Sequence, residues 1–307
     1  MLRKYSPSSL QGGFDREKYF EGWFQKVYSA EHKLSFIIIY GYATQHSHAT
    51  FGFIQVHIPH QEPVLLHFPK DEVFCDPAQH LVRMGKHTLS AKEIAINTEE
   101  MGINLSLMDN EPIRTFKNSM GYSYIIPNLP CYHSVLNKSH AVSGEIRNIQ
   151  KRYSFVNEIG YLEKNWGTSF PEKYLWLHAV DPKDPEVSLL FSQAEIVWLG
   201  RKFTRHVGHL NYDGKVLDLR KLKKCVVSIS NISSHNQLIR ISSTSIQLEL
   251  SIALDQKILF KGPQDGVLSR DILHHTDARM DVSLTHGSHT RLFSLVGNYE
   301  NIDGKFG

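Results

Sequence analysis

SIQLELSIALD, residues 245–255, alternates between apolar and polar side chains except at Ala253. Every second position is apolar, namely Ile246, Leu248, Leu250, Ile252 and Leu254. The positions between them are filled by polar Gln247, Glu249 and Ser251. Because successive side chains of a strand point to opposite faces, this stretch predicts a strand with one buried and one wet face.

The period of two recurs along the chain, at residues 103–107 and again at 280–284. Turn signals separate such runs. Asp213-Gly214 lies between two strand-like runs, and the short polar turn Ala30–Lys33 lies between residues 23–28 and 34–42. Helical signals are weak, even at Ser90–Asn97. We therefore predict an all-β chain of antiparallel strands with few short helices.

The length of 307 residues suggests two β domains rather than one. Long antiparallel sheets must protect their edges, and closure into barrels is the general solution. The clearest break in mid-chain is the polar, proline-bearing turn Asp181–Glu186. We expect the boundary within residues 169–184 and predict two barrels, at residues 1–175 and 176–307.

Composition argues against several classes of partner. The formal net charge of +3 gives little reason to expect nucleic acid or an acidic membrane surface. Cys75, Cys131 and Cys225 lie far apart, which argues against a disulfide scaffold or a cysteine-built zinc site. The chain opens without an apolar signal segment, and its longest apolar run, Phe36–Tyr40, is far shorter than the ~20 residues of a membrane span. We expect a soluble, cytoplasmic protein of undetermined oligomeric state.

YFEGWFQKV, residues 19–27, is the first candidate for a functional segment. Glu21 and Trp23 are two residues apart, so in a strand they share a face and could line a cavity. The alternative is structural, because a Gly-Trp pair early in a β chain can mark the start of a barrel that the indole plugs.

GYLEKNWGTSFPEKYLWLH, residues 160–178, is the second candidate. If it is extended, Tyr161, Glu163 and Asn165 share one face, and the other face carries Leu162, Lys164 and Trp166. A further shared face carries Tyr174, Trp176 and His178. The functional interpretation is an aromatic cavity wall with one carboxyl group, and the structural one is an ion pair between Glu163 and a nearby base beside a packed Trp166.

Other motifs give no positive signal. The 18 histidines include the pair His46 and His48, which could ligate a metal from one strand face, but no helical His-Glu-x-x-His pattern occurs. Nucleotide-binding and nucleophile-elbow motifs do not occur either. We expect no metal and no cofactor.

Taken together, the two motifs resemble those of the tocopherol cyclase-like family. YFEGWFQKV is similar to that family's FFEGWYFKV pattern, and residues 160–178 are similar to its YxEKNWGxxFPxxWxWxQ pattern. The second similarity rests on Glu163, Lys164, Asn165, Trp166, Gly167, Phe170, Pro171 and Trp176. Weaker similarities cover residues 131–146 and 262–275, and all four segments stand in family order.

This resemblance implies a lipocalin-like, calycin architecture, with two β-barrel halves in tandem. The family's named activity closes the chromanol ring of a prenylated hydroquinone, and related families act on other long, apolar, unsaturated substrates in a dry cavity. In such chemistry a general acid protonates an alkene, and the phenol oxygen attacks the resulting tertiary cation. A carboxyl group in an apolar pocket, with a raised pKa, suits this task.

The resemblance therefore implies an acid, Glu163 or Glu21, and a ligand-binding wall. That wall would consist of Trp23, Tyr161, Asn165, Trp166, Trp176 and His178. Each aromatic face could stabilise the cation by ~1–2 kcal/mol. Lys164 would lower the pKa of Glu163 unless strand parity points the two side chains apart.

The sequence departs from the family pattern near the end of the second motif. His178 replaces its glutamine, Val180 a following asparagine, and Tyr174 a tryptophan, so we expect a different head group on the ligand. The chain lacks a recognisable plastid transit peptide, and tocopherol is not the expected product. We therefore carry two hypotheses, a cyclase or isomerase acting on an isoprenoid, and a non-catalytic carrier of an apolar ligand.

Overall fold

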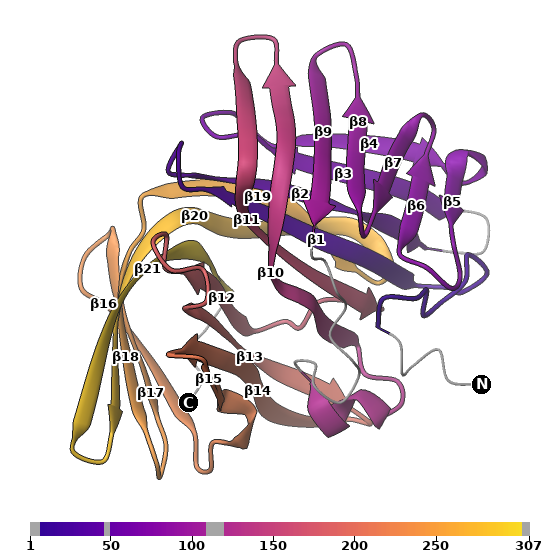
Figure 1. The fold of residues 1–307 in the computed structure, drawn as a ribbon. Helices are drawn as coiled ribbons and strands as arrows, with labels where there is room; N and C mark the ends of the chain where they lie inside the picture. The colour runs from indigo at the N-terminus through magenta and orange to yellow at the C-terminus, as the bar shows by residue number, and fades with distance from the viewer. Residues whose placement is uncertain (1–6, 46–49, 109–119, 303–307) are drawn as a thin grey trace. The chain divides into compact units, whose positions relative to one another are not determined.

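The computed structural model describes residues 7–45, 50–108 and 120–302. The chain forms two compact units (Figure 1). The first comprises Met1–Phe170 with Lys261–Arg270, and the second comprises Pro171–Phe260 with Asp271–Gly307. Each unit is built on one large antiparallel sheet, which confirms the predicted all-β fold class.

The first unit holds an eleven-stranded sheet with the order β4-β3-β2-β1-β11-β10-β9-β8-β7-β6-β5. Its strands are β1 (Tyr19–Ser29), β2 (Leu34–Thr44), β3 (Thr50–His57), β4 (Val64–Pro69), β5 (Val73–Cys75), β6 (Leu81–Met84), β7 (His87–Ser90), β8 (Glu93–Asn97), β9 (Met101–Met108), β10 (Cys131–Asn148) and β11 (Arg152–Gly167).

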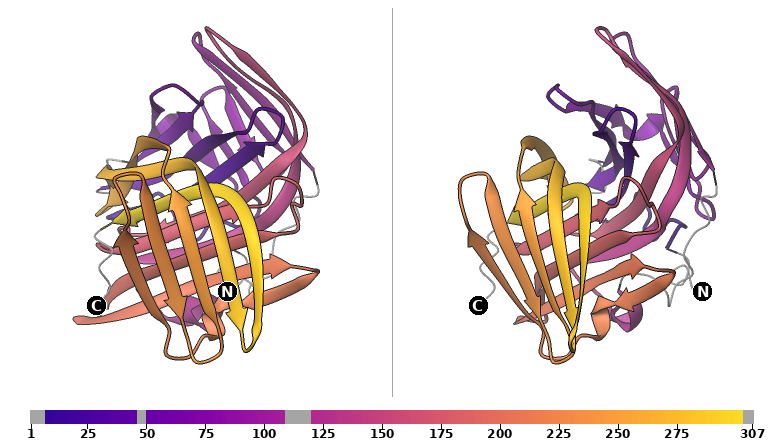
Figure 2. Two further views of the ribbon diagram at one scale, coloured as in Figure 1. Left: turned by 90° about the vertical axis from the view of Figure 1, so that its left-hand side faces the viewer. Right: turned by 60° about the vertical axis from the view of Figure 1, so that its left-hand side comes forward.

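The two ends of this sheet approach each other. The edge strands β4 and β5 are neighbours in sequence, joined by the short 3-10 helix η2 (Lys70–Glu72). A Cβ atom added to Gly52 on β3 would lie 2.6 Å from Val73 on β5 and 3.1 Å from the Met84 sulfur on β6. The sheet therefore curls towards a barrel, as the curved strands of the first unit in Figure 2 show.

The second unit holds a ten-stranded sheet with the order β15-β14-β13-β12-β21-β20-β18-β17-β16, and β19 pairs with β20 (Figure 2). Its strands are β12 (Tyr174–Val180), β13 (Ser188–Trp198), β14 (Arg201–Tyr212), β15 (Lys215–Asp218), β16 (Val226–Asn231), β17 (Asn236–Ser242), β18 (Gln247–Ala253), β19 (Gln256–Gln264), β20 (Val267–His286) and β21 (His289–Ile302).

The alternating stretch at residues 245–255 contains β18, and its apolar side chains lie in the core of the second unit. Leu248, Leu250 and Ile252 are fully buried, in one cluster with residues such as Leu177 on β12 and Met280 on β20. Along β18 the burial alternates between buried and more accessible side chains. The predicted strand with one wet face is confirmed.

Both predicted hairpins are confirmed as well. β1 and β2 flank the turn at residues 30–33, and β14 and β15 flank Asp213-Gly214. Asp213 and Gly214 have φ angles of 51° and 66°, the left-handed conformation that such a two-residue turn requires. Ser90–Asn97, the best helical candidate, contributes instead to β7 and β8. The helices described are short 3-10 turns, η2, η4 (Gly121–Ile125) and η5 (Leu219–Lys221).

The turn between β19 and β20 returns to the first unit, which the sequence did not indicate. Gln55 on β3 donates to the Lys261 carbonyl at 2.9 Å and accepts from the Lys261 amide at 2.8 Å. The Gly266 amide donates to the Thr168 carbonyl at 3.0 Å. Hydrogen bonds therefore fix this late segment to residues that lie early in the chain.

Candidate functional site

Strand β11 carries the second sequence motif and presents its side chains to two different faces. Glu163 contacts Tyr161 and Asn165, whereas Lys164 contacts Glu21. The alternation predicted for residues 161–166 is therefore confirmed. Because Lys164 points away from Glu163, it does not hold the Glu163 carboxylate in an ion pair.

Glu163 lies at the centre of a buried polar cluster on strands β10 and β11. Its Oε2 accepts a hydrogen bond from the Tyr161 hydroxyl at 2.6 Å and lies 2.9 Å from Nε2 of His133. Its Oε1 accepts from the Asn165 amide at 3.3 Å. Glu163 is 5% exposed, and the His133 side chain is 16% exposed. The cluster thus combines a carboxyl group, an imidazole and a phenol in a largely dry place.

The pKa of Glu163 results from opposing causes. Burial raises it, but the charge of His133 and the hydrogen bonds from His133, Tyr161 and Asn165 together lower it below its usual range. The expectation of a raised pKa is therefore wrong for this state of the protein. Glu163 therefore favours the carboxylate form, whose Oε2 lies 2.9 Å from Nε2 of His133.

The Glu163 carboxylate also changes the pKa values of Tyr161 and Cys131. Burial and then the charge of Glu163 raise the pKa of Tyr161 well above its usual value. The same two causes raise the pKa of the Cys131 thiol, on β10. Tyr161 and Cys131 therefore stay protonated at neutral pH, and Tyr161 acts as a hydrogen-bond donor to the carboxylate.

His133 was not among the residues predicted for the site. It lies thirty positions before Glu163 and reaches it through the antiparallel register of β10 and β11, in which His133 pairs with Asn165. The weak family similarity of residues 131–146 is the one sequence signal that points towards His133. The register itself contains β-bulges that alternation cannot reveal.

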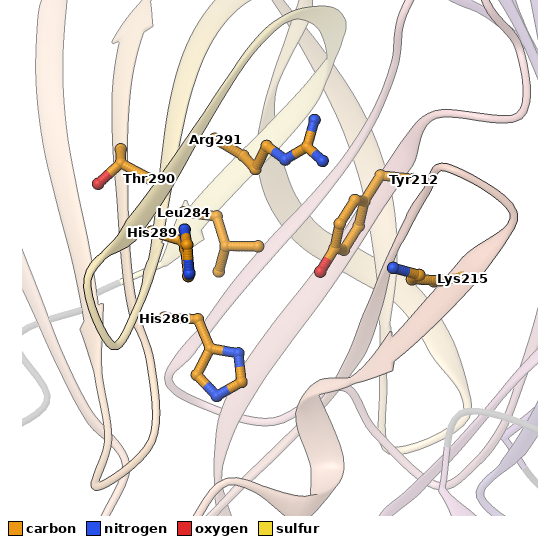
Figure 3. A pocket seen from close by; sticks show the side chains of 7 residues that line it. All are labelled: Tyr212, Lys215, Leu284, His286, His289, Thr290 and Arg291. Atoms are coloured by element: carbon orange, nitrogen blue, oxygen red, sulfur yellow. The ribbon is translucent and has the colours of Figure 1, made fainter.

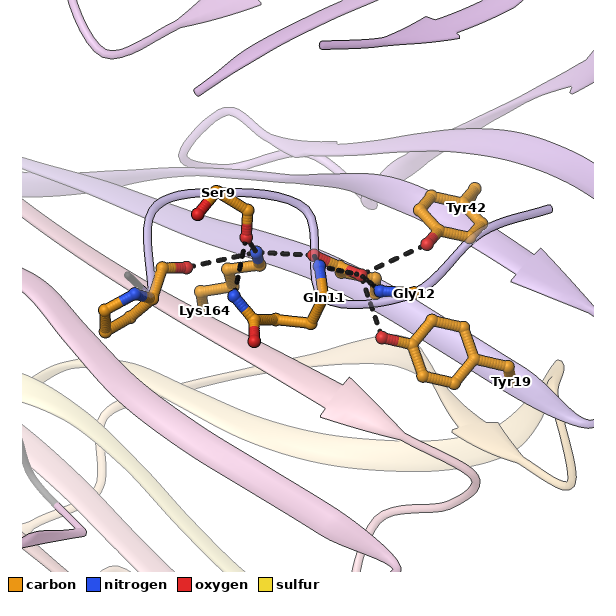
Figure 4. Close-up of polar contacts among 8 residues, drawn as sticks. Ser9, Gln11, Gly12, Tyr19, Tyr42 and Lys164 are labelled. Carbon is orange, nitrogen blue, oxygen red and sulfur yellow. Dashed lines mark hydrogen bonds and ion pairs between the residues drawn. The ribbon is translucent and has the colours of Figure 1, made fainter. Parts of the chain in front are cut away.

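Glu21 belongs to a different cluster, on the other face of the first sheet. Its carboxylate forms an ion pair with Lys164 Nζ at 2.5 Å, and both side chains are fully buried. Four further groups donate to it, the amides of Gln11 and Gly12 and the hydroxyls of Tyr19 and Tyr42 (Figure 4). All acceptor positions of this carboxylate are therefore in use.

Lys164 ties the N-terminal segment to the same cluster. Its Nζ donates to the carbonyls of Pro7 and Ser9 at 3.1 and 2.7 Å. Burial lowers the pKa of Lys164, and the charge of Glu21 opposes that effect. Residues 7–12, which we call the strap, thus close over the ion pair, and Figure 4 shows them looping past Lys164. This arrangement favours a structural role for Glu21.

Aromatic rings pack against Lys164 from two sides. Its Nζ lies 4.6 Å from the Trp23 ring centroid and 5.4 Å from that of Trp166. Trp23 stacks on Tyr40 and His80, with centroids 5.6 and 5.3 Å apart. Burial, with the charge of Lys164, lowers the pKa of His80 to about 3, so this imidazole is neutral. Trp23 and Trp166 therefore pack against a fully buried lysine.

Trp176 and His178 lie in the second unit, on β12. Trp176 is 6% exposed and His178 1% exposed. Trp176 lies against His274 of β20, with ring centroids 6.0 Å apart. Tyr174, on the same strand face, donates to Glu300 at 2.7 Å. The predicted ligand-binding residues thus fall into three groups, around Glu163, around Lys164, and on β12.

A pocket of about 430 Å³ lies elsewhere in the second unit, beside the turn between β20 and β21 (Figure 3). It is lined by Tyr212, Lys215, Leu284, His286, His289, Thr290 and Arg291. Its basic, exposed lining does not suit an isoprenoid chain, and it contains none of the predicted site residues.

Two of the predictions concern metals and membranes. His46 and His48 lie outside the described residues, and within residues 7–45, 50–108 and 120–302 no group of three or more His, Cys, Asp or Glu side chains is arranged to hold a metal ion. Over that same portion of the chain, no helix has the length and apolar character needed to cross a membrane.

Comparison with known proteins agrees with the family resemblance. The family described as tocopherol cyclase-like matches residues 110–250, which include two of the four similar segments and both Glu163 and His133. The resemblance seen in the motifs is thereby confirmed over this range. No curated protein matches the chain in sequence.

Two solved structures share the fold. One is an ATTH candidate from Nitrosomonas europaea, with a TM-score of 0.51 and 11% identity over 92% of this chain and 91% of that one. The other is kievitone hydratase from Nectria haematococca, with a TM-score of 0.50 and 8% identity over 97% of this chain and 94% of that one. At such identities the likeness concerns the fold alone.

Proposed function

We propose that this protein is an enzyme of the cyclase or hydratase type, which adds an O–H group across a carbon–carbon double bond. Its substrate would be a prenylated hydroquinone or a related isoprenoid. The matched family and the fold shared with a hydratase support this class. The observation that carries the proposal is the buried hydrogen-bonded pair of Glu163 and His133, with Tyr161 beside it.

The pair shares one ionisable proton, and the surroundings decide where it resides. In the free protein the His133 side chain is 16% exposed and so retains some contact with water, and its hydrogen bond helps to lower the pKa of Glu163. An apolar substrate that covers His133 removes that water, and a desolvated ion pair loses part of its advantage over the neutral pair. Burial is the largest single influence on the pKa of Glu163, and it raises that pKa. The proton then moves to Glu163, which becomes the required neutral acid.

The reaction conserves all atoms. Glu163 gives its proton to the less substituted alkene carbon, where a C–H bond forms and the π bond breaks. The phenol oxygen of the same substrate attacks the tertiary cation to form the C–O bond, and its proton returns to the pair. Capture of the cation by water instead would give the hydrated product. No oxidant or reductant is needed for either outcome.

A conservative substitution tests the assignment. Glu163→Gln keeps the shape and an oxygen that can accept the hydrogen bond from the Asn165 amide, but it cannot donate an acidic proton. Loss of a general acid typically lowers the rate by ~10²–10⁴-fold. The matched control is Glu158→Gln on the same strand, because Glu158 is 6% exposed and accepts hydrogen bonds from Ser29 and the Ala30 amide at the β1–β2 turn.

Turnover of a panel of prenylated hydroquinones, followed by mass spectrometry, separates the possible roles. Loss of turnover in Glu163→Gln alone, at an unchanged melting temperature, supports the acid. A lower melting temperature with normal turnover assigns Glu163 to a structural ion pair. Tight binding of an apolar ligand with no product in the wild type makes the protein a carrier, the second function that this fold could serve.

A further inference from the structure

We propose that the second unit carries a separate binding site for a hydroxyl group of a ligand, built around Asn298, His274 and Glu300. These residues lie on strands β20 and β21, beside Trp176 on β12. Leu175 and Leu177 belong to the apolar core of the unit, so Trp176 between them faces the opposite side of the sheet. The site is independent of Glu163 and of the reaction proposed above.

A chain of hydrogen bonds connects these residues. Nδ1 of His274 lies 2.7 Å from Oε1 of Glu300, and the Asn298 amide nitrogen lies 2.7 Å from Nε2 of His274. The Tyr174 hydroxyl donates to Oε2 of Glu300 at 2.7 Å. A carboxylate only accepts, so it fixes the imidazole proton on Nδ1 and leaves Nε2 to accept from Asn298. This network orients the Asn298 side chain.

The network does not use the side-chain oxygen of Asn298. Asn298 is fully buried, and its Oδ1 has no hydrogen-bond partner among the described residues. Thr276 is also fully buried, and within the same described ranges its hydroxyl has no partner either. Buried polar groups in native proteins nearly always have a partner, so Asn298 Oδ1 requires a donor from an ordered water or from a bound molecule. We assign that donor to a ligand, and the test below distinguishes the two.

The backbone at this point is irregular. Two residues of β20, Thr276 and Asp277, stand opposite the single residue Asn298 of β21, because the register shifts between His275 and Ala278. Asp277 adopts a left-handed φ of 56°. Bulges of this kind redirect side chains and are frequent next to binding sites. The bulge therefore places Thr276 and Asn298 opposite each other on neighbouring strands.

The chemistry of the surroundings defines the ligand. Asn298 Oδ1 is an acceptor, so the ligand must offer a donor, and the nearby Glu300 carboxylate disfavours an anion. The rings of Trp176 and Phe260 lie 6.0 and 5.5 Å from the His274 ring and give the cluster aromatic walls. A neutral phenol, or an alcohol on an unsaturated skeleton, has the matching features.

The test compares 2-naphthol with its methyl ether, 2-methoxynaphthalene, neither of which contains an isolated alkene for Glu163 to protonate. We expect the full-length protein to bind the naphthol about tenfold more tightly in calorimetry, because one hydrogen bond to a buried acceptor distinguishes the two. Asn298→Leu should abolish this preference. The matched control is Asn211→Leu, because the Asn211 amide bonds to Ser188 on the same sheet and its Oδ1 is likewise buried without a partner among the described residues; this variant should retain the preference.

A measurement on the wild-type protein tests the proposal even if the Asn298→Leu variant does not fold. The side-chain amide signal of Asn298 in ¹H–¹⁵N spectra should shift with naphthol and not with the ether. Equal affinities for the two compounds, a preference that survives Asn298→Leu, or binding of neither compound would each overturn the proposal. None of these results depends on whether Glu163 acts as an acid.

Discussion

The buried ion pair of Glu21 and Lys164 should be one of the most sensitive points of the first unit. Both side chains are fully buried, and their charged atoms are 2.5 Å apart. Removing one partner of such a pair leaves an uncompensated buried charge, which typically costs ~3–5 kcal/mol of stability. The two possible single substitutions leave different groups behind, so their costs can be worked out separately.

Lys164→Met leaves the Glu21 carboxylate with four donors, two from backbone amides of the strap and two from tyrosines. These donors keep the loss near the lower limit, at about 3 kcal/mol. Glu21→Gln leaves Lys164 with two carbonyls and two indole faces. Burial already lowers the pKa of Lys164, so this lysine can release its proton, which again limits the loss to about 3 kcal/mol.

The double variant Glu21→Gln with Lys164→Met removes both charges together. It should also cost about 3 kcal/mol rather than the sum of about 6, which gives a coupling energy of about 3 kcal/mol. Chemical denaturation followed by tryptophan fluorescence measures these values, and limited proteolysis reports whether residues 7–12 detach. Single losses below about 1 kcal/mol, or losses that add within about 0.5 kcal/mol, would refute the reasoning.

Three further predictions follow from single positions. In His133→Gln, burial should raise the pKa of Glu163, which is lowered in the wild type. The lowered pKa stabilises the wild-type fold above the carboxyl pKa of the unfolded chain, so the difference in unfolding free energy between the two proteins should shrink as the pH falls below that pKa. Denaturation at a series of pH values measures this difference. Gly41→Ala should cost about 1–3 kcal/mol or more, because the new Cβ would lie 2.2 Å from the Glu21 carbonyl oxygen, and expression with a normal melting temperature would contradict this. The paired Gly22→Ala, whose Cβ would meet its nearest atoms at 3.4 Å, should change stability by less than about 1 kcal/mol in the same thermal assay.

Alternation in the sequence was sufficient to predict the strands and much of the site's local geometry. Residues 245–255 form a strand because one face packs into the core, and Glu163 and Lys164 separate because neighbours in a strand face opposite ways. Alternation concerns residues that are adjacent in sequence, so it predicts correctly only those features that depend on adjacent residues.

Partners that are distant in sequence could not be predicted in this way. His133 reaches Glu163 through the register of two long strands with bulges, and Lys164 meets Glu21 across β1 and β11. The raised pKa expected for Glu163 was wrong because alternation cannot reveal that an imidazole lies 2.9 Å away. The strap and the returning segment Lys261–Arg270 likewise depend on tertiary hydrogen bonds.

The most direct test of the central claim is the isotope content of the product formed in D₂O. Protein and a geranylated hydroquinone are incubated in D₂O, and the product is analysed by mass spectrometry. If the pair of Glu163 and His133 supplies the proton, the wild-type product contains one carbon-bound deuterium per ring closure, and Glu163→Gln forms ~10²–10⁴-fold less of it. A product without deuterium, or undiminished formation by Glu163→Gln, would contradict the account.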